Sequence, residues 1–251
     1  ISVARRGTHA ERFVRPFDAS TISIVARLRT AAVPVMITVA PEGATTAQVA
    51  ELVQCGAVVS LGHSDADADT TRAYIAAGAT CFTHLFNAMS QLGNREPGLV
   101  GATLDNSATS SGLIADGVHV HPATIRAALR AKAGPGKIFL VTDAMSCVGS
   151  DLTEFELNGR TIYRQDGTLR LADGTLAGAD LDMISAVRFM MANTDIDMEE
   201  ALRMASLYPA QCLGVEATRG GFAKGNAADI VHLDDGQAVK TVWRLGFKLE
   251  V

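Results

Sequence analysis

The feature that most constrains the fold is a repeated pairing of a short apolar run with a helix-like segment. Apolar, β-rich runs recur along the first part of the chain, at 35–39, 57–62, 79–83, 111–116 and 137–142. Segments with apolar residues at helical spacing, such as 46–54 and 68–77, lie between them. Strands that are apolar on both faces and alternate with helices are typical of a parallel sheet. A chain of 251 residues is long enough for one α/β barrel.

The pattern changes after residue 142. Short alternating pieces from 155 to 171 surround Asn158-Gly159 and Asp166-Gly167, dipeptides that favour hairpin turns, and they predict an antiparallel excursion. Helical periodicity returns at 181–191 and 198–206. The chain then ends in two strand-like runs, at 229–233 and 239–243, which need partner strands outside the barrel.

Composition excludes some classes of partner. The net charge is -5 and the 22 basic residues are scattered, so no basic face for nucleic acid is predicted. No apolar run reaches the roughly 20 residues that cross a bilayer, and we expect no membrane association. The four cysteines are far apart in the sequence, which indicates reduced thiols and a cytoplasmic protein. A small molecule is the expected ligand.

Four polar residues follow predicted strands at equivalent positions: His63, His84, His119 and Asp143. In a (β/α)8 barrel the carboxyl ends of the strands meet at one rim, where active sites are built. Three imidazoles and a carboxylate suit a divalent metal ion such as zinc and an activated water molecule. We therefore expect these four side chains to surround one small volume.

Each of these residues also has a simpler interpretation. A single histidine after a strand is more often a loop residue bonded to backbone or solvent, and Asp143 in isolation is equally well explained as a helix N-cap. His9, His121 and His232 show no such regularity, and packing is their expected role. The recurrence at four strand ends weakens the simpler interpretation.

Short motifs at the strand ends carry a family resemblance. They are Leu61-Gly62-His63-Ser64, Thr83-His84-Leu85-Phe86-Asn87-Ala88-Met89, Arg95-Glu96-Pro97-Gly98-Leu99-Val100-Gly101, Ala115-Asp116-Gly117-Val118-His119 and Val141-Thr142-Asp143-Ala144. Together they resemble N-acetylglucosamine-6-phosphate deacetylases, over essentially the whole chain. The resemblance implies an α/β fold, a (β/α)8 TIM barrel of the metal-dependent hydrolase type that is N-terminally incomplete, with part of a small β-sandwich.

The resemblance implies a role for each matching residue. His63 and His84 would be metal ligands, and Asp143 the catalytic base and acid that moves a proton from a metal-bound water to the departing amine. His119 would contact the substrate at the acetyl carbonyl. The implied substrate contacts are Thr8, Asn87, Ala88, Arg95, His119, Leu176, Ala177 and Gly178. Arg95 would bind phosphate, near the interface of a homodimer.

Taken alone, several of these positions have ordinary structural explanations. Asn87-Ala88 can form a turn, Arg95 can be a solvated charge, and 176–178 can lead into a helix. The family's third metal ligand is a glutamate that we expect upstream of Ile1. The expected metal is zinc, with iron, manganese or cobalt as alternatives. We expect residues 1–228 to form the barrel without its first strand or strands, and 229–251 to belong to the β-sandwich.

The expected reaction is deacetylation of N-acetyl-D-glucosamine 6-phosphate to D-glucosamine 6-phosphate and acetate, in amino-sugar catabolism. Two alternatives remain open from the sequence. One is another amidohydrolase-type metal enzyme that acts on a cyclic amide and shares the barrel but not the phosphosugar. The other is a non-catalytic protein that binds sugar phosphates and lacks the metal.

Overall fold

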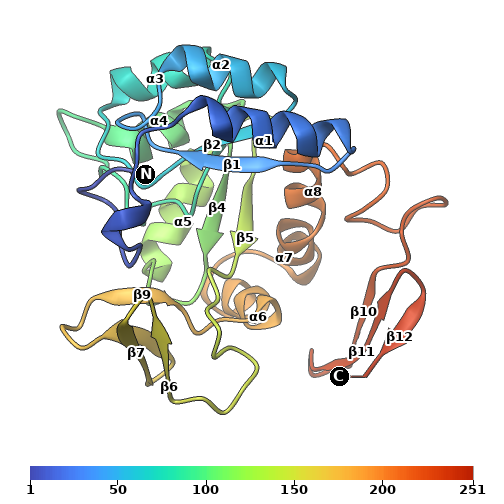
Figure 1. The fold of residues 1–251 in the computed structure, drawn as a ribbon. Coiled ribbons are helices and arrows are strands. Elements are labelled where there is room, and N and C mark those ends of the chain that lie inside the picture. Colours follow the sequence, from blue (N-terminus) through green and yellow to red (C-terminus); the bar gives the residue numbers. More distant parts are fainter. Residues whose placement is uncertain (251) are drawn as a thin grey trace.

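The centre of the molecule is a parallel sheet of five strands (Figure 1). A computed structural model describes residues 1–250. The strands pair in the order in which they occur in the sequence: β1 (Met36–Val39), β2 (Val58–Leu61), β3 (Cys81–Phe82), β4 (Ser110–Ile114) and β5 (Ile138–Val141). Sequential parallel pairing with intervening helices is the arrangement of a (β/α)8 barrel. The five strands form part of such a barrel, which confirms the predicted fold class.

Helices precede or follow these strands, and α1, α2, α3 and α5 begin at side-chain caps. A short 3-10 helix, η1 (Glu11–Phe13), comes first, followed by α1 (Ala19–Thr30), α2 (Thr46–Gln54), α3 (Ala68–Ala76), α4 (Gly98–Asp105) and α5 (Pro122–Ala131). At α2 the Thr45 hydroxyl accepts from the backbone N–H of Gln48, whose side chain bonds back to Thr45. Asp18 and Asp67 accept the equivalent bonds at α1 and α3. These caps satisfy N–H groups that the first turn of a helix leaves free.

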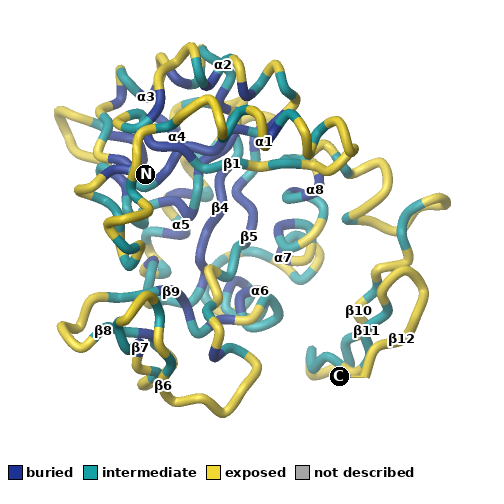
Figure 2. The backbone as a smooth tube through the Cα atoms, in the orientation of Figure 1, coloured by how far each residue is buried: buried dark blue, intermediate teal, exposed yellow. Residues whose placement is uncertain are grey.

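The main core lies between the parallel sheet and its helices. Figure 2 shows buried backbone along β4 and β5 and beneath α2 and α3. Phe82, Leu61 and Leu113 of the strands are fully buried, as is Leu52 of α2. Burial on both faces explains why these strands are continuously apolar rather than alternating.

Helix α4 lies in a segment rich in glycine and proline, where no helix was predicted. Nearly all of it is buried, including Leu99 and Val100. A Cβ atom at Gly101 would come within 2.4 Å of the Cβ atom of Pro97, so the glycine permits a close approach of the preceding loop. Tertiary packing therefore outweighs the poor helix propensity of glycine here.

A four-stranded antiparallel sheet follows β5 and confirms the predicted excursion. Its strands are β6 (Glu154–Leu157), β7 (Arg160–Gln165), β8 (Thr168–Leu171) and β9 (Leu176–Ala179). Ile162 and Leu169 form a second small core with Cys147. In Figure 1 this sheet lies beyond the carboxyl ends of β4 and β5, so it borders the rim where the site was predicted.

The last part of the chain holds three helices and a second antiparallel sheet. The helices are α6 (Met183–Asn193), α7 (Met198–Ala205) and α8 (Leu207–Leu213), and the strands are β10 (Ile230–Leu233), β11 (Val239–Arg244) and β12 (Phe247–Leu249). The sheet lies apart from the parallel sheet in Figure 1. Strand β12 was not predicted, although it supplies one of the partners that β11 needed. Within residues 1–250, no helix combines the length and apolarity needed to cross a membrane.

A cluster of hydroxyl groups joins three strand segments inside the parallel sheet. The Thr83 Oγ1 atom lies 2.9 Å from Thr38 Oγ1 and 2.7 Å from Ser60 Oγ. A Cβ atom at Gly62 would come within 2.8 Å of the Thr83 Cβ atom, so the chain is closely packed there. Because Gly62 and Thr83 directly precede His63 and His84, this cluster lies immediately below both histidines.

Replacing Thr83 with valine is expected to lower the free energy of unfolding by about 1–2 kcal/mol, because two part-buried hydroxyl groups lose a partner. Thr83→Ser keeps the hydroxyl and is expected to lose less. Urea denaturation monitored by circular dichroism measures both variants. A larger loss in Thr83→Ser than in Thr83→Val would show that the methyl group, and not the hydroxyl cluster, carries the effect.

Candidate active site

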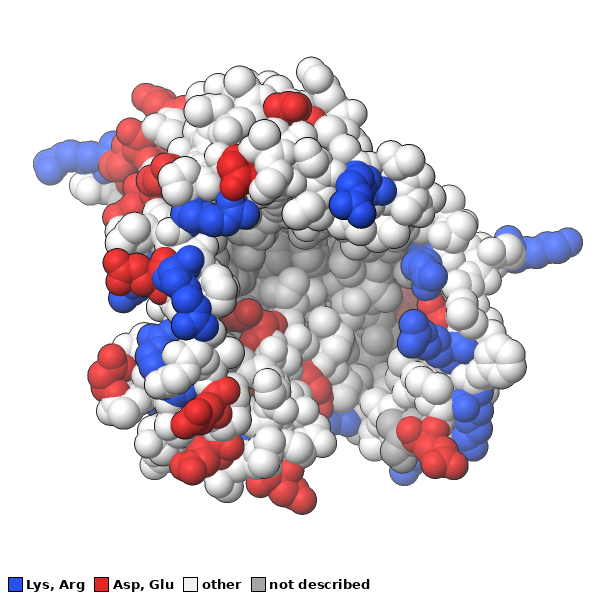
Figure 3. All heavy atoms as spheres, viewed as in Figure 1, with Lys and Arg blue, Asp and Glu red and all other residues white. Residues whose placement is uncertain are grey.

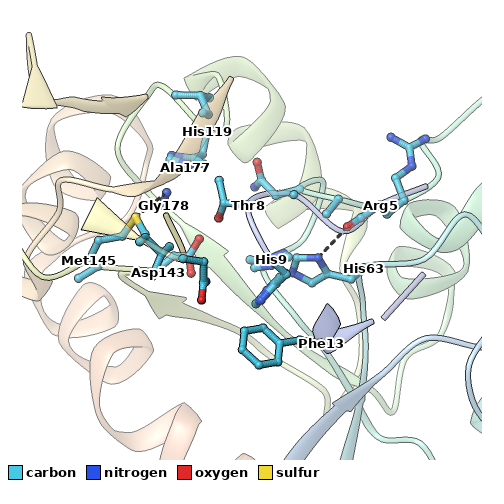
Figure 4. A pocket seen from close by; sticks show the side chains of 18 of the residues that line it. Arg5, Thr8, His9, Phe13, His63, His119, Asp143, Met145, Ala177 and Gly178 are labelled. Carbon is cyan, nitrogen blue, oxygen red and sulfur yellow. Dashed lines mark hydrogen bonds between the residues drawn. The ribbon is translucent and has the colours of Figure 1, made fainter. Parts of the chain in front are cut away.

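The four polar residues predicted at strand ends line one cavity of about 610 Å³. His63 follows β2, His84 follows β3, His119 follows β4 and Asp143 follows β5. Figure 4 shows the labelled side chains of His63, Asp143 and His119 around a common space. Figure 3 shows that this face of the molecule is hollowed, with basic and acidic side chains mixed around the hollow. The expected convergence is therefore present in the fold.

The rings of His63 and His84 face each other through their Nε2 atoms, which lie 2.9 Å apart. The Nδ1 atom of His63 lies 2.8 Å from the backbone oxygen of Arg5. A carbonyl oxygen only accepts, so Nδ1 of His63 carries the proton and Nε2 presents a lone pair. Nδ1 of His84 is buried without a hydrogen-bond partner in the described part of the chain.

Burial in the cavity shifts the pKa values of both imidazoles and of the carboxyl group. Burial and the neighbouring His84 lower the pKa of His63 to about 4. Burial also lowers the pKa of His84, although Asp143 opposes the shift. Desolvation in the cavity raises the pKa of Asp143, and His84 and His119 oppose that change. Neutral imidazoles are the form in which histidine binds metal ions.

Three of these residues have unusual backbone conformations. His63, His84 and Asp143 have φ angles of 50°, 31° and 53°, in the left-handed region that residues other than glycine seldom occupy. Such conformations cost on the order of 1–3 kcal/mol each and persist where the surrounding structure enforces them, often at functional sites. The same strain at three strand ends indicates that the fold maintains this arrangement of side chains.

Strand β9 supports the backbone of Asp143. The backbone N–H of Ala179 donates to the backbone carbonyl oxygen of Asp143 over 2.8 Å. Ala144 and Ala179 form a parallel bridge. Gly178 lies against the same segment, with its N–H 3.1 Å from the sulfur of Met145. The antiparallel sheet therefore borders the cavity and holds the backbone from which the Asp143 carboxylate projects.

The cavity also contains most of the predicted substrate contacts. Its lining includes Thr8, Asn87, Ala88, Leu176, Ala177 and Gly178. Arg95 is not among the lining residues; it is exposed on the loop between β3 and α4. Among residues 1–250 no recorded bond holds its guanidinium at the cavity, and its role stays a prediction.

Sequence reasoning missed several lining residues. His9 stands edge-on to His63, with ring centroids 5.1 Å apart, although packing was its expected role. Phe13, Met145 and Asn158 also line the cavity. For His9 the only available signal was its position next to Thr8. The others come from η1, the loop after β5 and the β6–β7 turn, where no periodicity indicated a common location.

The imidazole pair fits a divalent metal ion in donor type and orientation, because two Nε2 atoms converge and neither ring is charged. Within residues 1–250, no group of three or more histidine, cysteine, aspartate or glutamate side chains is arranged to hold a metal ion. The described residues therefore supply two good ligands, fewer than the three protein ligands usual at a catalytic zinc site.

The chain is similar to several known proteins. The model of the amidohydrolase family matches residues 22–247. The chain is 44% identical over 246 residues to the N-acetylgalactosamine-6-phosphate deacetylase of Shewanella sp. (strain ANA-3), a match that covers 98% of this chain and 61% of that protein. It is 37% identical over 255 residues to the N-acetylglucosamine-6-phosphate deacetylase of Bos taurus, covering 98% of this chain and 62% of that protein.

Among solved structures, a mutant Mycobacterium smegmatis N-acetyl-D-glucosamine-6-phosphate deacetylase in complex with N-acetyl-D-glucosamine-6-phosphate superposes with a TM-score of 0.89 and 37% identity. That superposition covers 99% of this chain and 66% of the other. The chain thus spans about three fifths of the length of the curated relatives it matches.

Proposed function

This chain belongs to the amidohydrolase family, and from that premise we propose that it is the catalytic part of a deacetylase for N-acetylated amino-sugar 6-phosphates. The observation that carries the proposal is the meeting of His63, His84 and Asp143 at one cavity, with two Nε2 atoms 2.9 Å apart. The reaction would yield the free amino-sugar phosphate and acetate, as in amino-sugar catabolism.

We propose a divalent metal ion, with zinc as the first candidate, held by Nε2 of His63 and of His84. When bound, it would act as a Lewis acid toward the amide carbonyl and toward water. Asp143 then accepts a proton from the attacking water molecule as the new C–O bond forms. It returns this proton to the nitrogen as the C–N bond breaks, because an amine leaves as a neutral group only after protonation.

We assign His119 to the acetyl carbonyl, where negative charge develops, and Asn87, Ala88 and Arg95 to the phosphate. Ala88 has a φ angle of 49°, and its carbonyl oxygen accepts from the Ser64 N–H, which holds this turn beside His63. Arginine suits phosphate because its guanidinium donates paired hydrogen bonds. Since Arg95 lies outside the cavity of its own chain, we propose a homodimer in which Arg95 lies near the subunit interface.

We further propose that residues 1–228 belong to the barrel domain and residues 229–251 to a small β-sandwich, because the β10–β12 sheet pairs with no strand of the parallel sheet. A cytoplasmic location is supported by four cysteines that form no disulfide and by a phosphorylated substrate. Neither proposal affects the chemistry of the site.

The sugar epimer is a separate question, and the galactosamine substrate is the second candidate. The relative from Shewanella, named for N-acetylgalactosamine 6-phosphate, is 44% identical, against 37% for the bovine protein named for N-acetylglucosamine 6-phosphate. The two sugars differ only in the orientation of one ring hydroxyl, which a single hydrogen bond in the cavity can distinguish.

Acetate release by the full-length, zinc-loaded protein tests the proposal. N-acetylglucosamine 6-phosphate, its galactosamine epimer, the two unphosphorylated sugars and a cyclic imide serve as substrates. Turnover of a phosphorylated N-acetyl sugar supports the proposal, and the better epimer decides between the two candidates. Activity on the cyclic imide alone would replace it with the cyclic amide hydrolase alternative, and sugar-phosphate binding without turnover would indicate a non-catalytic binding protein.

Replacing Arg95 with alanine is expected to lower kcat/KM for the phosphorylated sugar by about 10–100-fold, because a hydrogen bond to a charged group contributes about 1.5–3 kcal/mol. The unphosphorylated sugar should be little affected. Arg27→Ala on the exposed face of α1 is the matched control. Equal losses on both sugars would contradict a phosphate role for Arg95.

A further inference from the structure

The loop after β4 contains a largely buried carboxylate, that of Asp116, to which the proposed reaction assigns no role. The Oδ2 atom of Asp116 lies 2.6 Å from Nδ1 of His119, and the side chains are only 11% and 7% exposed. Oδ1 of the same carboxylate accepts from the backbone N–H groups of Val118 at 2.9 Å and of His119 at 2.8 Å. One oxygen thus holds the main chain of the loop while the other holds the imidazole ring.

The path of the loop depends on the glycine between these residues. Gly117 has a φ angle of 76°, and a Cβ atom there would come within 2.7 Å of the Phe189 ring. Only glycine meets both conditions without strain. The bond from the Asp116 carboxylate and the tight turn at Gly117 hold His119 where it lines the cavity.

The hydrogen bond determines which ring nitrogen carries the proton. Burial raises the pKa of Asp116, but hydrogen bonds from the His119 ring and from two backbone N–H groups outweigh this and hold the pKa below its ordinary value. An ionised carboxylate only accepts, so Nδ1 of His119 is the donor. Nε2, on the opposite edge of the ring, remains for the cavity, whose other charged or titratable lining residues are Arg5, His9, His63, His84 and Asp143.

We infer that Asp116 is a positioning residue, which accepts a hydrogen bond from Nδ1–H of His119 and orients the ring so that Nε2 faces the acetyl group of the substrate. This inference rests on the proposed function for the identity of the substrate, but the proton on Nδ1 does not depend on it. Because Asp116 accepts at Nδ1, the ring stays in place when Nε2 also carries a proton and donates to the acetyl oxygen.

Asp116→Asn separates positioning from a merely structural role. The asparagine oxygen keeps the acceptor for Val118 and His119 N–H, so the loop retains its backbone bonds. Its NH₂ group replaces Oδ2 and donates where the carboxylate accepted, which moves the ring proton from Nδ1 to Nε2. Asp197→Asn is the matched control, because that side chain also accepts one backbone N–H, from Glu200 at the start of α7, and contacts no histidine.

The experiment is NMR of the ¹⁵N-histidine-labelled, full-length protein, in which a His119→Gln variant assigns the His119 signals. The wild type and Asp197→Asn are expected to show a proton on Nδ1 of His119, and Asp116→Asn to lose it. Steady-state kinetics on the same proteins should show kcat lowered by about 10–100-fold in Asp116→Asn with KM little changed. Failure of the proposed function would appear earlier, as absence of acetate release by the wild type.

Two results would overturn the inference. One is a wild-type His119 whose Nδ1 carries no proton. The other is an Asp116→Asn protein in which Nδ1 of His119 loses its proton while kcat stays at the wild-type value. The proton on Nδ1 would then have no effect on the reaction.

Discussion

An Asp143→Asn variant is expected to lose about 10²–10⁴-fold in kcat while binding the substrate almost as well as the wild type. Asparagine has nearly the same shape but takes up no proton, so the transfer from water to the leaving amine fails. Asparagine is also one of the few residues that tolerate a left-handed backbone, and Asp143 has a φ angle of 53°. The loop should therefore keep its path, and the loss should be chemical rather than structural.

The measurement is kcat from acetate release and Kd from calorimetry with the same phosphorylated sugar. Asp182→Asn is a suitable control, because Asp182 caps α6 by accepting from Ser185 N–H, a bond that asparagine preserves. It should keep wild-type turnover. Near-normal kcat in Asp143→Asn would show that another group moves the proton, whereas lost binding would indicate a metal-holding or structural role for the carboxylate.

Much of the fold followed from local patterns because the strands are buried on both faces. Helix α2 was predicted with the bounds that it has, since the capping residue Thr45 and the apolar spacing agree. Helix α4 was not predicted, because its glycines favour a loop when packing is ignored. Strand β12 is only three residues long and all three are exposed, so neither periodicity nor burial distinguished it from the preceding turn.

The site was predictable to the extent that strand ends are equivalent in a barrel. His63, His84 and Asp143 occupy such ends, so topology alone predicted that they meet. His9 and Asn158 come from segments that reach the rim through hydrogen bonds between residues far apart in the sequence. One of these bonds runs from Arg12 Nη2 to Asn158 Oδ1 over 3.1 Å. No spacing in the sequence encodes those bonds. The loop position of Arg95 was visible from the sequence, but its proposed phosphate contact depends on a second subunit.

A Gly178→Ala variant is expected to lose about 10²-fold in turnover, although Gly178 supplies no reactive group. Its added Cβ atom would lie 2.7 Å from the backbone oxygen of Asp143 and 2.7 Å from Cγ of Met145. Both distances are shorter than ordinary van der Waals contact, which begins near 3.4 Å. The methionine side chain can move, but the Asp143 oxygen belongs to the backbone that positions the carboxylate. Relief of the clash shifts that backbone or β9, and a displacement of roughly 1 Å at a reacting group can cost about 10²-fold.

Gly221→Ala is the matched control, since a Cβ atom at this exposed position meets only the Asn226 side chain at 4.0 Å. It should retain full activity, because glycine-to-alanine changes without a clash alter mainly the unfolded state. Urea denaturation of Gly178→Ala should still show one cooperative transition, which would separate a displaced carboxylate from a protein that no longer folds. Wild-type turnover in Gly178→Ala would mean that β9 does not determine the position of Asp143. The antiparallel sheet would then border the cavity without contributing to the chemistry.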